Sequence, residues 1–146
     1  MSIDNAVSGV PEANRLEGGA RLQGGRVLRD PHGPLVSIVT VVLNGADHLA
    51  EAMESVFAQD YPNLEYIVID GGSTDGTLDL IRNAKDQIDY WRSEPDRGLY
   101  DAMNKGIKLA QGRVIGLLNA DDVLYPDAVG KVIQYMGDHP EQKYTC

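Results

Sequence analysis

Cysteine is nearly absent from the sequence, and the one that occurs, Cys146, is the last residue. A disulfide within the chain is therefore excluded, and zinc ligation by cysteines has no support. The longest apolar runs, such as residues 35–43, are far shorter than the roughly 20 residues that cross a bilayer. The N-terminus also lacks the apolar stretch of a signal peptide. We therefore expect a cytoplasmic protein with no transmembrane segment.

Positive charge is scarce as well, because 13 Lys and Arg face 22 Asp and Glu, for a net charge of −9. A protein that coats nucleic acid needs a basic surface, so we expect no nucleic-acid partner. A small anionic ligand is not excluded, since one local site can be positive on an acidic protein. The histidines show no metal-ligand spacing, and we interpret His32, His48 and His139 as ordinary surface residues.

Residues 1–34 show neither a helical nor an alternating hydrophobic period. They contain six glycines, three prolines and four acids balanced by four arginines. This composition predicts a disordered N-terminal tail. The remaining residues, 35–146, carry the whole net charge and are long enough for one domain with a hydrophobic core.

Strand and helix patterns alternate through the rest of the chain. Short apolar, β-branched runs predict strands at 35–43, 64–69, 88–92 and 114–118. Amphipathic periods predict helices at 46–59, 77–86, 99–111 and 126–137. This order predicts an α/β fold with a mostly parallel, Rossmann-like sheet and helices on both faces.

Polar residues follow three of the predicted strands, at Asn44, Asp70 and 119–122. Because the carboxyl ends of parallel strands share one edge of a sheet, we expect these residues to converge on a ligand site. A carboxylate at Asp70 suits hydrogen bonds from a base or ribose, and the two glycines after it let a flat ring approach the backbone. A plain tight turn is the alternative for Asp70; for Asp75 we favour a helix cap.

The acids Asp121 and Asp122 are hard oxygen ligands suited to Mg²⁺ or Mn²⁺ bound together with a phosphate. Two acids after a strand are, on their own, more often a solvated loop, so the other signals have to decide. Asp121 is our first choice of metal ligand, with Asp122 either a second ligand or a residue that holds the loop. Asn119 suits a hydrogen bond to ribose.

Further candidate residues lie between the third and fourth predicted strands. Arg97 and Lys105 are the cations nearest the proposed site in sequence, and a diphosphate leaving group requires positive charge or a metal. Asn104 falls in the middle of a predicted helix, where asparagine is unfavourable. Its amide either turns toward a ligand or is simply exposed, and Tyr100 belongs either to the core or to a pocket wall.

These residues together resemble the family 2 glycosyltransferases of the GT-A fold. The resemblance covers about residues 35–140 and rests on VSIVTVVLNGADHLAEAMESVFAQDYPNLEYIVIDGGSTDGTLDLI, EPDRGLYDAMNKGI and GRVIGLLNADD, in that order. It implies a nucleotide-diphospho-sugar donor, a divalent metal, and transfer to a glycan or lipid-linked acceptor with inversion at the anomeric carbon.

The resemblance also implies roles for particular residues. Val42 and Asn44 match the loop that lines the base, and Asp70 matches the acid that contacts it. Asn119 and Asp121 fall in the DxD-type motif that contacts ribose and metal. Two departures stand out: many relatives have Asp where this chain has Asn119, and Ala-Arg-Asn where it has Ala-Met-Asn at 102–104. We hypothesise that Arg97 replaces the missing phosphate-contacting arginine.

Length is the larger departure. Family members continue beyond the DxD-type motif into an acceptor-binding half that carries the general base, whereas here the sequence ends 24 residues after Asp122 (146 − 122). We therefore expect a donor-binding half that is truncated at the C-terminus, with no catalytic base of its own. The alternative is a non-catalytic module that binds a nucleotide or a partner.

Two other enzyme classes are less favoured. The string DGGST occurs in sugar kinases and ATPases within a hairpin, but here it joins a strand to a helix. A dinucleotide-binding domain requires a GxGxxG fingerprint after the first strand, and the sequence has none there.

Overall fold

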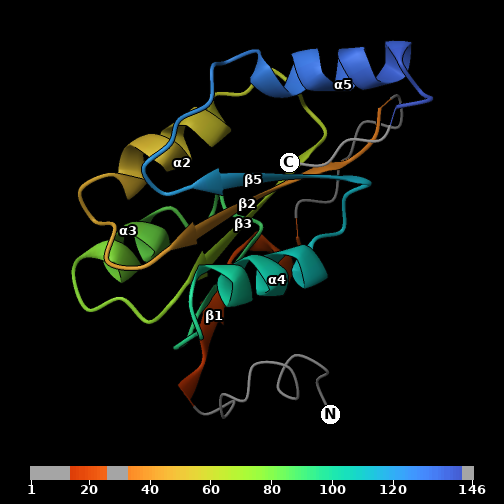
Figure 1. The fold of residues 1–146 in the computed structure, drawn as a ribbon. Helices are drawn as coiled ribbons and strands as arrows, with labels where there is room; N and C mark the ends of the chain where they lie inside the picture. The colour runs from red at the N-terminus through yellow and green to blue at the C-terminus, as the bar shows by residue number, and fades with distance from the viewer. Residues whose placement is uncertain (1–13, 26–32, 143–146) are drawn as a thin grey trace.

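The computed structural model describes residues 14–25 and 33–142, which form one sheet with helices packed against it (Figure 1). The strands are Leu16–Gly18 (β1), Val36–Val42 (β2), Leu64–Asp70 (β3), Tyr90–Ser93 (β4) and Val114–Asn119 (β5). The helices are Leu49–Phe57 (α2), Thr77–Asn83 (α3), Leu99–Leu109 (α4) and Ala128–Asp138 (α5), with a short 3-10 helix, η2, at Ala20–Gln23. None of the helices in this part of the chain is long and apolar enough to span a bilayer.

The strands lie in the order β1-β4-β3-β2-β5. The four strands β2 to β5 are parallel to one another, and only β1 runs antiparallel, along β4. Alternate residues of the central strands face opposite sides. Ile38 and Val68 join the apolar cluster under α2, α3 and α5, whereas Val39 and Ile67 join the cluster under α4. The predicted fold class, a mostly parallel α/β sheet with helices on both faces, is confirmed.

The edge strand β5 is less buried than its apolar sequence suggests. Its Leu118 is buried in the cluster under α2 and α5, but Ile115 and Leu117 on the other face are 37% and 43% exposed. The reason is the position of α4, which packs over β2 and β3 and leaves this face of β5 uncovered.

Residues 14–25 differ from the prediction of a disordered tail over 1–34. They form β1 and η2, with Leu16 paired with Ser93 and Gly18 with Trp91. Glycine, which we interpreted as a sign of disorder, is what permits this close approach. A Cβ at Gly18 would lie 2.7 Å from the indole nitrogen of Trp91, and Gly19 has a φ of 108° beside the backbone of Asp89. Residues 1–13 and 26–32 of the predicted tail lie outside the described residues.

Candidate functional site

The carboxyl ends of four strands meet along one edge of the sheet. Val41 pairs with Asn119 of β5, Val42 with Asp70 of β3, and Asp70 with Ser93 of β4. Neighbouring strands are about 4.8 Å apart, so these positions form a row roughly 15 Å long. The loops that leave this row carry most of the residues that the sequence singled out.

The side chain of Asp70 is fully buried and holds the loop that follows β3. Its Oδ2 accepts hydrogen bonds from the backbone N–H groups of Gly72 (3.3 Å) and Ser73 (3.1 Å) and from the Ser93 hydroxyl (2.6 Å). Its Oδ1 accepts one from the Ser73 hydroxyl. These bonds fix the glycine-rich backbone at the sheet edge, and contact of Asp70 with a base stays a prediction.

The loop after β2 is tied to the loop after β3. Asn44, which has a φ of 49°, donates its backbone N–H to the Ser73 hydroxyl (2.7 Å), and its side-chain oxygen accepts from the Thr74 N–H (2.9 Å). The side chain of Val42 lies in the core just below, and its carbonyl accepts from the Gly71 N–H (2.9 Å). Val42 and Asn44 therefore belong to one wall of the candidate site.

Asp75 lies one residue before Gly76, the N-cap of α3, and its side chain accepts hydrogen bonds at the start of that helix, as a cap does. Its Oδ1 accepts from the Thr77 N–H (2.9 Å) and hydroxyl (2.5 Å), and its Oδ2 accepts from the Ala46 N–H (3.2 Å). The hydrogen bonds from Thr77, followed by that from Ala46, hold the pKa of Asp75 below its ordinary value. Asp75 thus adds another link between the two loops.

The acidic turn after β5 lies on the other side of the β2 loop. Ala120 is 3.5 Å from where a Cβ would lie at Gly45, and the Asp122 N–H donates to the carbonyl of Asn119 (3.1 Å). Asn119, Asp121 and Asp122 are all exposed. Neither carboxylate takes part in a side-chain hydrogen bond or ion pair with the described part of the chain, so both are open to a ligand.

The arrangement fits one class of metal ion. Among the described residues no three His, Cys, Asp or Glu side chains gather into a group able to hold a metal. Mg²⁺ and Mn²⁺ are commonly held by one or two carboxylates, with substrate phosphates and water completing the coordination. Asp121 and Asp122 match that donor set.

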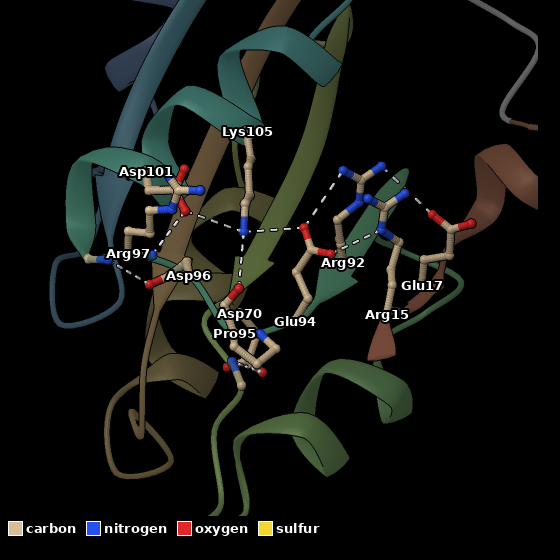
Figure 2. A network of polar contacts seen from close by, with 12 residues as sticks. Arg15, Glu17, Asp70, Arg92, Glu94, Pro95, Asp96, Arg97, Asp101 and Lys105 are labelled. Atoms are coloured by element: carbon tan, nitrogen blue, oxygen red, sulfur yellow. Dashed lines mark hydrogen bonds and ion pairs between the residues drawn. The ribbon is translucent and has the colours of Figure 1, made fainter. Parts of the chain in front are cut away.

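The loop between β4 and α4 forms the third side and carries Arg97, which is exposed (Figure 2). The loop is folded by carboxylates, because Asp101 accepts from the Arg97 N–H (2.9 Å) and Asp96 from the Gly98 N–H (3.0 Å). Lys105, the other candidate cation, is buried and its Nζ lies 3.2 Å from a carboxylate oxygen of Glu94. Of these two cations, Arg97 alone is exposed.

Two candidate residues of α4 have exposed side chains. Asn104 is exposed, and none of the contacts within the described residues joins its side chain to the other candidate residues. Tyr100 is 80% exposed, which excludes it from the core.

Sequence reasoning missed two participants on the β4 side. Ser93 holds Asp70, and a carboxylate oxygen of Asp96 lies 2.6 Å from where a Cβ would be at Gly71. Neither was detectable from local pattern, because each acts on a loop that belongs to a different strand. The one available signal was Gly71, a glycine that admits close contact with another segment.

Comparison with known proteins shows the family of this chain. The sequence profile described as Glycosyl transferase family 2 matches residues 37–145. The chain belongs to glycosyl transferase family 2. An uncharacterised glycosyltransferase of Mycobacterium tuberculosis is 42% identical over 103 residues, which are 69% of this chain and 39% of that protein. A PGL/p-HBAD biosynthesis glycosyltransferase of Mycobacterium bovis is 38% identical over 111 residues, covering 73% of this chain and 43% of the relative.

Solved structures confirm the GT-A glycosyltransferase fold of this family 2 member. TarS 1–349 from S. aureus, in complex with UDP-GlcNAc, superposes with a TM-score of 0.67 at 20% identity, over 73% of this chain and 32% of that chain. The mannosyltransferase PcManGT from Pyrobaculum calidifontis, in complex with GDP-Man and Mn²⁺, also gives 0.67, at 28% identity over 78% and 36%. The chain spans about two fifths of the length of the curated relatives described above.

Proposed function

We propose that this chain is the donor-binding half of an inverting glycosyltransferase, which uses a nucleotide-diphospho-sugar and Mg²⁺ or Mn²⁺. The acceptor would be a glycan or a lipid-linked acceptor, as in polysaccharide biosynthesis, and would bind to a further half. The observation that carries the proposal is the row of strand ends. It brings the exposed carboxylates of Asp121 and Asp122, the glycine-rich loop after β3 and the loop that carries the exposed Arg97 to the same edge of the sheet.

Each side of this edge has a separate task in donor binding. The wall held by Asp70 and Asn44 presents backbone and glycine surface to the base and ribose, and Asn119 offers an amide to the ribose. Asp121 and Asp122 would hold the metal, which when bound neutralises the diphosphate. Arg97 supplies positive charge as negative charge develops on the leaving group. Asn104, which is exposed on α4, is a further proposed contact of the donor.

Comparison with the solved structures supports a nucleotide-sugar donor but leaves the base open. TarS was solved with a UDP-sugar and PcManGT with a GDP-sugar and Mn²⁺. Both nucleotides are therefore needed as probes. No residue of this chain is assigned as the general base, so we propose donor binding with little transfer by residues 1–146 alone. The scarcity of cysteine supports a cytoplasmic location.

The test is calorimetric titration of residues 1–146 with UDP and with GDP, with and without Mn²⁺. We expect one nucleotide to bind in a metal-dependent way. Asp121→Asn should weaken binding in Mn²⁺ at least about tenfold, because a metal-directed carboxylate is lost. Asp86→Asn is the matched control, because this acid is also exposed but lies beyond the C-terminal end of α3, away from the strand ends. The nucleotide affinity of this variant should match that of the unmodified chain.

The outcomes separate the candidate functions. Metal-dependent binding of a nucleotide without sugar transfer supports a donor half. Nucleotide binding that depends neither on Mn²⁺ nor on Asp121 supports the alternative of a non-catalytic nucleotide module. Binding of neither nucleotide contradicts donor recognition. Efficient transfer of sugar by residues 1–146 contradicts the assignment of this chain as a half.

A further inference from the structure

The segment 14–25 precedes the part of the chain that matches the family, yet it supplies cations to two buried glutamates of the domain. Glu94 is 1% exposed, and its Oε2 lies 3.1 Å from Nε of Arg15. Glu65 is 0% exposed and forms an ion pair with Arg21. A buried carboxylate that loses its partner is strongly destabilised. The segment is therefore part of the folded domain.

These two ion pairs lie near opposite ends of β4, because β1 runs antiparallel along that strand. Arg15 precedes the residue that pairs with Ser93, where β4 ends at the candidate site. Arg21 donates its backbone N–H to Asp89 (2.8 Å), before β4 begins. Its partner Glu65 lies near the start of β3 and also accepts a hydrogen bond from the Gln111 N–H (2.9 Å), beyond the end of α4.

Glu94 connects Arg15 to the loop that carries Arg97 (Figure 2). Besides Arg15, Glu94 contacts Nζ of Lys105 at 3.2 Å. Lys105 also lies 3.6 Å from Asp101, whose carboxylate accepts the Arg97 N–H. The contacts thus run in series from Arg15 through Glu94, Lys105 and Asp101 to the backbone of Arg97.

Charge balance gives a reason why a change at Arg15 would affect the backbone of Arg97. The cluster contains three cations, Arg15, Arg92 and Lys105, and three carboxylates, Glu17, Glu94 and Asp101. Removing Arg15 leaves one negative charge in excess in a mostly buried place. We expect Lys105 then to move toward Glu94 and away from Asp101, so that Asp101 is held less firmly against the Arg97 N–H.

We propose that Arg15 is a positioning residue for the donor site: through Glu94 and Lys105 it holds residues 94–98, so that Arg97 faces the diphosphate and Asp96 faces Gly71. Donor positioning rests on the proposed function, whereas the effect of Arg15 on loop order does not. The N-terminal segment, which lies outside the family match, thereby becomes part of the donor site's scaffold.

The experiment compares Arg15→Met with Arg21→Met in residues 1–146. Each change removes one arginine of the same segment from a buried glutamate, but only Arg15 lies on the site side. Amide exchange of the Arg97 N–H should rise at least about fivefold in Arg15→Met, since its acceptor is released, and less than about twofold in Arg21→Met. Both variants should lower the melting temperature, so stability alone does not distinguish them.

Affinity is the second measurement, made with UDP and GDP in Mn²⁺. Arg15→Met should weaken whichever nucleotide binds by about tenfold, which corresponds to one charge-assisted hydrogen bond, and Arg21→Met by less than about twofold. In an Arg97→Ala background, Arg15→Met should add little, because its effect passes through Arg97. Arg15→Lys keeps the charge and should restore most of the affinity; it also serves if Arg15→Met does not fold.

The outcomes distinguish the two proposals. Unchanged exchange at Arg97 in Arg15→Met overturns the positioning role, whatever binds. Equal losses of affinity in the two arginine variants, or full additivity with Arg97→Ala, also overturn it. If the unmodified chain binds neither UDP nor GDP, the donor function fails, and the exchange measurement then still decides whether Arg15 orders the loop.

Discussion

Gly106 leaves no room for a side chain between α4 and the central strand β2. A Cβ at this position would lie 2.2 Å from Cγ1 of Val39 and 3.3 Å from both its Cβ and Cγ2. Carbon atoms normally approach to about 3.5–4.0 Å. Val39 is 1% exposed and β-branched, so it has little rotamer freedom. Gly106→Ala must therefore lift α4 from the sheet by roughly 1.5 Å.

The free energy of unfolding follows from two opposed effects. Overpacking of a well-packed core costs about 1–3 kcal/mol, and this contact belongs at the upper end because both partners lie on packed backbone elements. Alanine in place of glycine within a helix returns about 1 kcal/mol. We expect Gly106→Ala to destabilise the protein by about 2 kcal/mol.

Urea denaturation followed by circular dichroism measures this change, with Gly137→Ala as the matched control. Gly137 also lies in a helix, α5, but apart from its chain neighbours and the backbone of its own helix no atom of the described residues lies within 4 Å of its Cβ position. There we expect a gain of up to about 1 kcal/mol, the opposite sign. In Val39→Ala/Gly106→Ala the added methyl has room, and the loss should be at least about 1 kcal/mol smaller than the sum of the single changes. A Gly106→Ala variant as stable as the unmodified chain would refute the reasoning.

Three further predictions concern other parts of the fold. Burial raises the pKa of Tyr90 to about 12. The stability that Tyr90 contributes is therefore present below pH 10 and lost as the pH rises toward 12. The urea midpoints measured at pH 9 and at pH 11 should differ less in Tyr90→Phe than in the unmodified chain. Gly18→Val should displace β1, because Trp91 is in the way, and shift the fluorescence of this single tryptophan to the red; unchanged emission would contradict the fit of Gly18 against Trp91. Thr77 lowers the pKa of Asp75, so Asp75→Ala should lose stability at neutral pH, with the difference narrowing as the pH falls below the ordinary value of 3.8. A difference in stability between the two proteins that stays constant across that pH range would show that the charge of Asp75 is not its cause.

The strands and helices of the domain could be predicted because their causes are local. Runs of β-branched residues and amphipathic periods gave each element within a few residues of its observed bounds. The differences are at the ends, where chain geometry decides. The helix predicted at 99–111 ends at Leu109, because Ala110 is already extended (ψ 137°). The helix predicted from Pro126 begins at Ala128, after a turn.

What the sequence did not reveal depends on contacts between distant segments. The strand β1 exists because Gly18 fits against Trp91 and because Arg21 reaches Glu65, and nothing in its own composition distinguishes it from a tail. Lys105 of α4 had suggested a phosphate contact, but its ammonium group pairs in the interior with Glu94, a carboxylate of the loop that precedes the helix. The polar residues that follow strands were predictable as a group, because parallel strands deliver their ends to one edge. The role of each of these residues depends on what its side chain contacts, which the local sequence pattern does not specify.

The central strand β2 also determines the order in which this protein is expected to fold. Val36 pairs with Leu64 of β3 across a short connection and with Val114 of β5 across one more than twice as long. Closing the longer loop costs roughly 0.6 kcal/mol more per doubling of its length, and distant pairings form slowly. We expect β2, α2 and β3 to associate first and β5 to dock late. The acidic turn that follows β5 would then reach the rest of the site only in the final steps of folding, so that a partly folded chain already has the wall for the nucleotide but not the carboxylates for the metal.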